Sequence, residues 1–88
     1  MNSSGGWFVY ILRCGDGTFY TGITTDLSRR VAEHRGGKRG ARYTRSRRPV
    51  VLVYAEPALS RSAAAQREYQ LRRLSVEAKR LLIAAWRG

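Results

Sequence analysis

An apolar run followed by a glycine-flanked turn is the feature that most restricts the fold of this 88-residue chain. Residues 7–13 are almost entirely apolar, aromatic or β-branched, which favours a strand with both faces covered. Gly15-Asp16-Gly17 follows, and residues 18–23 have the composition of a second strand. This part of the chain therefore predicts a tight antiparallel hairpin.

The length of the hairpin loop decides which side chains share a face of the sheet. A three-residue loop pairs Leu12 with Tyr20 and Tyr10 with Gly22, which places both phenols on one face within reach of each other. It also leaves an open space above Gly22, where a ligand could approach. A two-residue loop would shift the register by one residue and put the phenols on opposite faces.

A helix is expected directly after the hairpin. Asp26 and the two threonines before it offer N-cap oxygens, and the helix runs to about Arg35 before Gly36-Gly37 ends it. Its apolar stripe consists of Leu27, Val31 and His34. Arg30 lies beside this stripe, whereas Arg29 falls on the outer side, where Glu33 can pair with it.

The second half of the chain predicts one more strand and two more helices. The strand covers residues 50–54, and either Ser60 or Ser62 caps a helix that runs to about Leu74. Ser75 caps the last helix, whose apolar residues have a helical period: Ala78, Leu81, Leu82, Ala85 and Trp86. The order β-β-α-β-α-α predicts an α+β fold, in which a small three-stranded antiparallel sheet is covered by about three helices.

The length of the chain allows one domain. We expect residues 7–88 to form it, after a short flexible start over residues 1–6. Cys14 is the single cysteine, which excludes an internal disulfide and a cysteine-based metal cluster. No stretch approaches a membrane span and no signal peptide is visible, so we expect a cytoplasmic protein that does not enter membranes. We assume a monomer.

The chain is strongly basic, with 17 lysines and arginines against 6 acids and a net charge of +11. Such an excess repels itself and is usually offset by an anionic partner, of which nucleic acid is the leading candidate. Only two of the cations are lysines, a bias that a GC-rich genome would also produce.

The segment from residue 36 to residue 49 is expected to be a loop that binds nucleic acid. It contains no acid and six cations: Lys38, Arg39, Arg42, Arg45, Arg47 and Arg48. Tyr43 in the same segment could stack on a nucleobase or could anchor the loop.

Glu68 is unusual in the helix that follows the third strand. Ala64 and Leu71 lie at helical spacing from it, so its carboxylate is on or beside the face turned toward the core. Because burying an unpaired charge is costly, two interpretations remain. Glu68 either forms a salt bridge with an arginine such as Arg72, or it is a metal ligand, since Mg²⁺ prefers carboxylate oxygens and water.

Taken in order, the sequence resembles the GIY-YIG nuclease superfamily, in particular its small stand-alone bacterial members. The matching pieces span most of the chain: Val9-Tyr10-Ile11-Leu12, Tyr20-Thr21-Gly22-Ile23-Thr24, Asp26-Leu27-Ser28-Arg29-Arg30 with His34, Gly40-Ala41-Arg42-Tyr43-Thr44 and Arg67-Glu68-Tyr69-Gln70-Leu71. Each piece is weak alone, whereas the set in this order is specific. Two positions depart from the family pattern: Val9 stands for the first glycine and Thr21 for the middle isoleucine of the second motif.

The resemblance implies a metal-dependent endonuclease that uses Mg²⁺ or Mn²⁺. It assigns five active-site residues: the signature tyrosines Tyr10 and Tyr20, the catalytic Arg30, the frequent active-site His34 and the metal-binding Glu68. Gly22 falls on the signature glycine. No second DNA-binding domain is present to choose a target, so branched, nicked or damaged DNA is an expected substrate in repair or recombination.

The implied chemistry needs an activated water and charge stabilisation. We expect nearby cations to lower the pKa of Tyr10, ordinarily about 10, so that it activates water while Tyr20 positions the water or the phosphate. Arg30 would stabilise the transition state and Glu68 would hold the metal, a Lewis acid. The alternatives are a non-catalytic basic DNA- or RNA-binding module that retains the fold, and a ribosome-associated basic protein.

Overall fold

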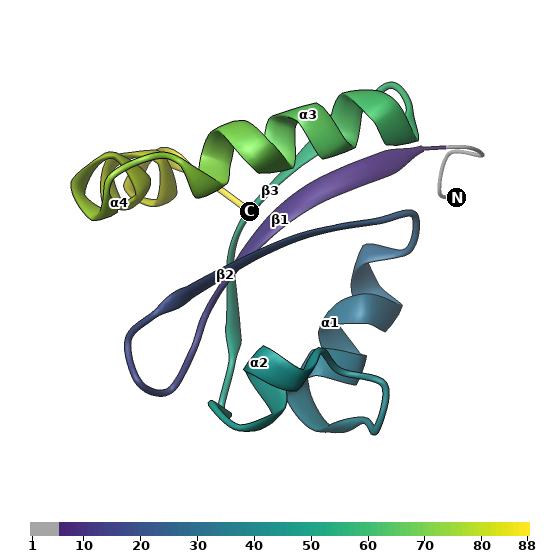
Figure 1. Cartoon of the computed structure of the whole chain (residues 1–88), viewed down its shortest axis with the longest axis vertical. Helices are drawn as coiled ribbons and strands as arrows, with labels where there is room; N and C mark the ends of the chain where they lie inside the picture. Colours follow the sequence, from purple (N-terminus) through teal and green to yellow (C-terminus); the bar gives the residue numbers. More distant parts are fainter. Residues whose placement is uncertain (1–5) are drawn as a thin grey trace.

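The computed structural model describes residues 6–88 and contains a three-stranded antiparallel sheet between two layers of helices (Figure 1). Its elements are β1 (Trp7–Arg13), β2 (Phe19–Thr24), α1 (Leu27–Gly36), α2 (Arg42–Arg45), β3 (Val51–Ala58), α3 (Arg61–Arg72) and α4 (Val76–Ala85). The predicted α+β fold with the order β-β-α-β-α-α is confirmed. The short helix α2 is an addition within the segment that was expected to be only a loop. The expected flexible start over residues 1–6 lies almost wholly outside the described residues.

The hairpin has the predicted three-residue loop. The amide of Cys14 donates to the carbonyl of Thr18 at 2.8 Å, and Gly17 takes a positive φ of 85°, which a glycine adopts without strain. Tyr10 consequently pairs with Gly22, and Leu12 pairs with Tyr20. The expected register is therefore confirmed.

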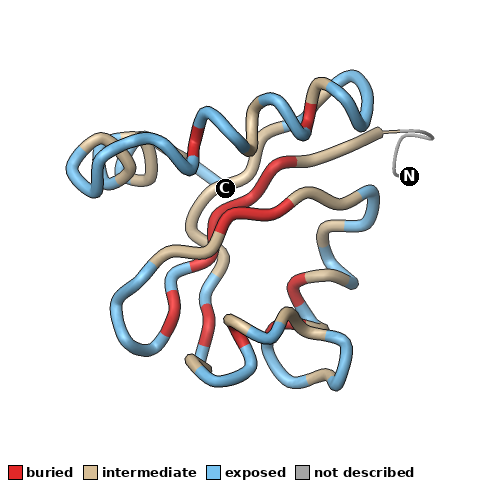
Figure 2. The backbone as a smooth tube through the Cα atoms, in the orientation of Figure 1, coloured by how far each residue is buried: buried red, intermediate tan, exposed pale blue. Residues whose placement is uncertain are grey.

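β1 is the central strand, because the sheet order is β2-β1-β3 (Figure 2). Both of its faces are buried, as its apolar composition predicts. Val9 and Ile11 pack against Ala64 and Leu71 of α3 on one face. Tyr10 and Leu12 belong to a separate cluster on the other face, together with residues of α1 and of the segment that leads into β3.

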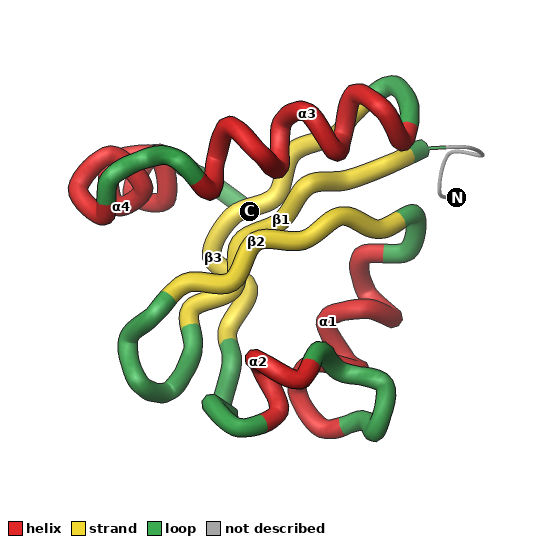
Figure 3. The backbone as a smooth tube through the Cα atoms, viewed as in Figure 1, coloured by secondary structure: helices red, strands yellow, loops and turns green. Residues whose placement is uncertain are grey.

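The helices divide between the two faces (Figure 3). α1 and α2 lie on the side of Tyr10, while α3 and α4 cover the side of Val9. Side-chain caps begin the three longer helices: Asp26 accepts from the amide of Arg29, Ser60 from Ala63 and Ser75 from Ala78. Ser60, and not Ser62, is therefore the cap of α3. Leu81 departs from the expected apolar face of α4, because its side chain is mostly exposed.

β3 extends four residues beyond the expected 50–54. Pro57 and the nearby Ala55 and Ala58 are poor strand formers. However, β3 is an edge strand, where a proline costs no ladder hydrogen bond on its outer side. Leu59 links β3 to α3 and is 98% exposed. Within the described residues no helix is long and apolar enough to cross a membrane.

Candidate active site

A buried chain of three polar side chains lies between the sheet and α1. The hydroxyl of Tyr10 is 2.8 Å from Nε2 of His34, and Nδ1 of His34 is 2.8 Å from Oγ1 of Thr44. Tyr10 is 1% exposed, and His34 and Thr44 are fully buried. Three elements contribute one residue each, so these hydrogen bonds link β1 to α1 and α2.

The partners of Thr44 assign the direction of these hydrogen bonds. Its hydroxyl donates its one proton to the carbonyl of Ala41 at 3.0 Å. Its oxygen is then the acceptor for a proton on Nδ1 of His34, a contact at 2.8 Å that is much shorter than the 3.5 Å from the amide of Ala41 to the same nitrogen. Nε2 of a neutral His34 is left as an acceptor, and the hydroxyl of Tyr10 donates to it.

Burial keeps both His34 and Tyr10 neutral near pH 7. The pKa of His34 falls to about 4, chiefly because burial disfavours the imidazolium and also because Arg30 and Arg48 are near. Burial raises the pKa of Tyr10 to about 12, with Tyr20 adding to the effect and Arg30 opposing it. The expected effect of a nearby cation is present, since Arg30 lowers the pKa of Tyr10, but desolvation outweighs it and the net shift is upward.

Aromatic rings surround the buried histidine. The ring of Tyr20 is 5.2 Å from that of His34 and 6.5 Å from that of Tyr10, measured between centroids. The two signature tyrosines thus share a face, as the hairpin predicted. Tyr20 is only half-buried, so its ring reaches from the cluster toward the surface.

The space above Gly22 is filled by the phenol of Tyr10. A β-carbon at Gly22 would lie 2.6 Å from Cζ of Tyr10, well inside contact distance. The expected open space for a ligand is therefore absent at this position. Gly22 instead allows the phenol to lie directly against the backbone of β2.

The side chain of Arg30 is held in place by the carboxylate of Glu33 and by a main-chain carbonyl. One nitrogen of its guanidinium donates to Glu33 at 2.8 Å and to the carbonyl of Arg39 at 2.7 Å. Glu33 also forms the expected ion pair with Arg29, at the longer distance of 3.9 Å. Arg30 also influences the pKa of Tyr10, which identifies it as a close electrostatic neighbour of the phenol.

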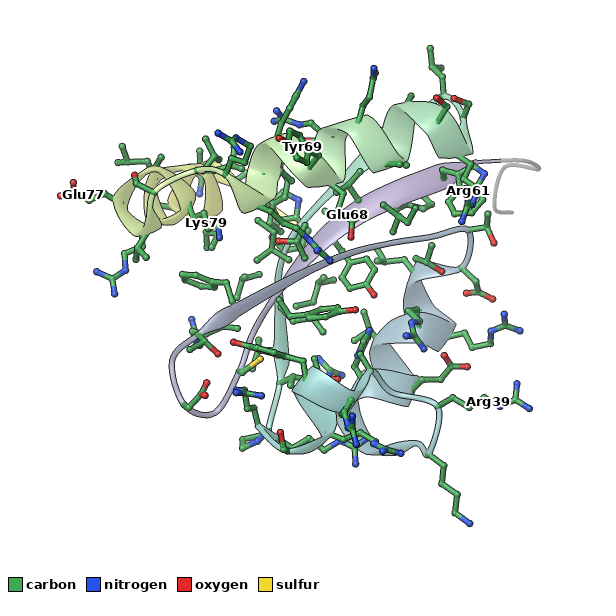
Figure 4. All side chains as sticks on the ribbon, in the orientation of Figure 1. Arg39, Arg61, Glu68, Tyr69, Glu77 and Lys79 are labelled. Carbon is green, nitrogen blue, oxygen red and sulfur yellow. The ribbon has the colours of Figure 1, made fainter. Side chains whose placement is uncertain are left out.

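Glu68 approaches the same site from the opposite helix layer. Figure 4 shows its carboxylate directed from α3 toward the sheet. Its Oε2 accepts from Arg72 at 2.9 Å, and Arg72 also donates to the carbonyl of Thr21 on β2 at 3.2 Å. The salt-bridge interpretation of Glu68 is thus confirmed. Its charge also raises the pKa of Tyr10, more weakly than burial and the neighbouring Tyr20 do.

The donor set around Glu68 suits a hard cation with few protein ligands. Residues 6–88 contain no group of three or more histidine, cysteine or acidic side chains that could enclose a metal. Oε1 of the half-buried Glu68 makes no hydrogen bond among these residues, so one carboxylate oxygen is free. Mg²⁺ is commonly bound through one or two carboxylates, substrate phosphates and water, and Glu68 fits that mode.

Two arginines that were expected to bind nucleic acid, Arg47 and Arg48, form hydrogen bonds within the protein instead. Arg48 donates to three main-chain carbonyls around the end of α1, those of Glu33, His34 and Gly37, at 2.6–3.1 Å. Arg47 pairs with Asp16 of the hairpin turn at 3.0 Å. Both side chains therefore hold the basic segment in place.

Tyr43 is an anchor of this segment. Its hydroxyl donates to Thr18 at 2.7 Å, and the guanidinium of Arg47 lies 3.8 Å above its ring. The ring of Tyr20 is 5.9 Å away. With these neighbours in place, the anchoring interpretation of Tyr43 is favoured over base stacking.

The remaining cations of the segment are at the surface. Lys38, Arg39, Arg42 and Arg45 are exposed, and Figure 4 shows Arg39 directed away from the molecule. Arg42 and Arg45 line a shallow depression of about 690 Å³ together with Tyr43, Ser46 and Arg47. These positions are accessible to a polyanion.

The sequence did not identify Thr44, Glu33 and Arg72 as parts of the site. Glu33 could have been found, because it lies one turn after Arg30 on the same helix. Arg72 is one turn after Glu68 and was considered only as its salt-bridge partner. Thr44 carries no local signal, since its contact with His34 depends on how α2 packs against α1.

The chain is similar to a known protein family, to related sequences and to solved structures. Residues 6–80 match the GIY-YIG catalytic domain. The UPF0213 protein of Desulfotalea psychrophila is 58% identical over 90% of this chain and 72% of its own length, and that of Natronomonas pharaonis is 53% identical over 88% and 89%. Two solution structures are similar. The UPF0213 protein of Bacillus halodurans is 44% identical over 90% of this chain and 83% of its own, with a TM-score of 0.56. A protein of E. faecalis is 34% identical over 96% and 88%, with a TM-score of 0.63.

Proposed function

The chain belongs to the GIY-YIG family, and we propose that it is a metal-dependent endonuclease that hydrolyses phosphodiester bonds in DNA. The observation that carries the proposal is the buried hydrogen-bonded chain from Tyr10 through His34 to Thr44. This chain of hydrogen bonds gives the phenol of Tyr10 a proton acceptor, His34. The pKa values of both groups are also shifted from their ordinary values, which is typical of catalytic groups. A module that only binds nucleic acid has no need of it.

Tyr10 and His34 together can accept the proton of the attacking water. A phenol with a pKa of about 12 is too weakly acidic to be a phenolate near pH 7. As the water attacks phosphorus, its proton moves to the hydroxyl oxygen of Tyr10 and the original phenolic proton moves to Nε2 of His34. The bond from phosphorus to the leaving ester oxygen breaks, and that oxygen takes up a proton from solvent. The imidazolium formed on His34 donates from Nδ1 to Thr44, and because burial lowers the pKa of His34 to about 4 it readily gives the proton up again.

The other residues stabilise charge and orient the phosphate. Arg30, held by Glu33, faces the negative charge that develops on the phosphoryl oxygens. Tyr20, half-buried beside the histidine, positions the water or the phosphate. Glu68 would hold Mg²⁺ or Mn²⁺ through its free oxygen, and the metal would supply Lewis-acid activation of the phosphate.

DNA is the proposed substrate because of the charge of the chain. A net charge of +11 and the exposed arginines around α2 favour binding to a phosphate backbone. Branched, nicked or damaged DNA, in repair or recombination, is the proposed class of substrate, and the assay below compares these forms directly.

The test is a cleavage assay with Mg²⁺ or Mn²⁺ on duplex, single-stranded, nicked, abasic and branched DNA. Arg30→Ala, Tyr10→Phe and Glu68→Ala are each expected to lower the cleavage rate by about 100-fold or more, as the loss of one transition-state contact does. Arg29→Ala is the matched control for Arg30, because Arg29 is its exposed neighbour on α1. Equal cleavage by the three variants and the wild type would point to a contaminating nuclease.

Binding without cleavage on every substrate would instead favour the basic DNA- or RNA-binding module. The salt-bridged Glu68 is the observation that allows this second candidate, since Arg72 already satisfies one of its oxygens. Removal of the divalent metal separates the two functions. It should abolish cleavage by a nuclease and leave the affinity of a binding module unchanged.

A further inference from the structure

A groove outside the buried cluster runs beside β2, the edge strand of the hairpin. It has a volume of about 260 Å³ and is lined by Phe19, Tyr20, Thr21, Tyr43, Arg72 and Lys79. We propose that this groove binds the phosphodiester backbone of the DNA strand next to the bond that is cleaved, with Lys79 as the cation that contacts a phosphate. The inference rests on the proposed function and extends the site to α4.

The groove is continuous with the candidate active site through two of its residues. Tyr20 lines the groove, and its ring is 5.2 Å from that of His34. Arg72 also lines the groove and pairs with Glu68 at 2.9 Å. A strand whose phosphate reaches the buried cluster would therefore enter this groove with its neighbouring nucleotides.

The groove is lined by two kinds of side chain. The rings of Tyr20 and Tyr43 offer apolar surface to a sugar or a base, while Arg72 and Lys79 supply positive charge. No acidic residue lines it. This pairing of aromatic surface with cations is how proteins follow a single strand of nucleic acid.

Lys79 is the cation of the groove whose charged group has no partner within residues 6–88. Arg72 already donates to Glu68 and to the carbonyl of Thr21. The ammonium of Lys79 makes no hydrogen bond or ion pair within residues 6–88, although its side chain is half-buried. In Figure 4 it lies on the side of α4 that faces the hairpin. A phosphate oxygen would provide the missing partner.

The groove leads toward the cationic surface of α2. Tyr43 lines both this groove and the depression formed with Arg42 and Arg45. The two hollows together offer cations on either side of one tyrosine, over a longer path than a single free phosphate would occupy. A polymeric anion therefore fits this surface better than a small one.

The experiment measures how the affinity for an oligonucleotide depends on salt, with Ca²⁺ replacing Mg²⁺ to suppress cleavage. Lys79→Ala is expected to weaken binding and to reduce the slope of log K against log salt by about 0.7–0.9, the loss of one phosphate contact. Arg80→Ala is the matched control, because Arg80 is the exposed next residue of α4 and its loss removes the same charge. Lys79→Arg should restore most of the affinity.

Neutral methylphosphonates locate the contact. Placed one at a time along the strand, they should include one position whose substitution weakens wild-type and Arg80→Ala binding but has no further effect on Lys79→Ala. The inference would be overturned if a methylphosphonate at every position weakened Lys79→Ala binding as much as it weakens wild-type binding. Equal slopes of log K against log salt for Lys79→Ala and Arg80→Ala would overturn it as well. Each variant is first checked for an unchanged unfolding temperature.

The outcomes separate this inference from the proposed function. If the protein cleaves DNA but Lys79→Ala behaves as Arg80→Ala does, the groove assignment fails and the nuclease assignment stands. If Lys79 couples to one phosphate but no metal supports cleavage of any DNA, the groove binds a strand in a protein that is not a nuclease.

Discussion

At the scale of single residues, the contact between Gly22 and Tyr10 is the most sensitive point of the site. Gly22→Ala should destabilise the fold by about 1–3 kcal/mol, because a β-carbon 2.6 Å from Cζ forces the phenol away from His34. Gly36→Ala is the control, since nothing lies within 4 Å of a β-carbon there. Urea unfolding of both variants measures the difference. Equal stabilities would contradict the close packing of the phenol.

His34 makes the stability of the fold depend on pH. Its folded pKa of about 4 is below the ordinary value of 6.5, so the unfolded chain binds a proton first as the pH falls. The free energy of unfolding should therefore decrease by about 3 kcal/mol between pH 6.5 and pH 4, since each pKa unit corresponds to about 1.4 kcal/mol. Urea unfolding across this range measures it.

A variant without the imidazole tests that assignment. His34→Gln should remove the decrease between pH 6.5 and pH 4 while leaving the losses caused by acids with lowered pKa values, such as Asp16 and Glu33, at lower pH. If His34→Gln keeps the wild-type pH profile, the imidazole is not the group responsible.

The residues of the site differ in how far the sequence could predict them. Tyr10 and Tyr20 share a face because the loop length fixes the register and side chains alternate along a strand. The direction of the pKa shift of Tyr10 could not be predicted, because its burial depends on α1 packing across the sheet. The direct contact of Gly22 with the phenol follows from the same packing.

At the scale of elements, the basic segment has two kinds of arginine. Arg48→Ala should lower the free energy of unfolding by about 2 kcal/mol, because it removes charge-assisted hydrogen bonds to the last carbonyls of α1. Arg42→Ala should leave stability within about 0.5 kcal/mol, since its side chain is exposed. Its effect should appear in DNA binding instead. Chemical denaturation and a binding titration of both variants check the contrast, which equal stability losses would refute.

The elements were predicted where the chain has strong local signals. The hairpin and the serine-capped helices carry their own turn and cap residues. α2 and the second half of β3 do not, since α2 is a single turn without a side-chain cap and the second half of β3 contains a proline. Their conformations depend on contacts with distant residues, such as the bond from Tyr43 to Thr18.

At the scale of the whole molecule, unbalanced charge should limit the stability of the free protein. Raising the ionic strength from about 0.01 M to 0.15 M shortens the Debye length from about 30 Å to 8 Å and weakens the repulsion among the cations. With a net charge of +11, the unfolding temperature should therefore rise with salt. Calorimetry measures it.

Variants with fewer surface charges provide the comparison. Replacing the exposed Arg35, Arg80 and Arg87 by glutamine should reduce the gain in unfolding temperature that salt produces. A gain that stays the same after these changes would show that repulsion among surface cations is not its cause.

The exposed link at Leu59 divides the site between two pieces of the chain. The segment before Leu59 contains Tyr10, Tyr20, Arg30 and His34, and the segment after it contains Glu68. A backbone cut at this link would give two fragments, neither with a complete set of the proposed catalytic groups. Their reassociation across the face of Val9 and Ile11 would be required for the proposed activity, and the domain would then suit complementation, in which cleavage of DNA reports that two fused partners have met.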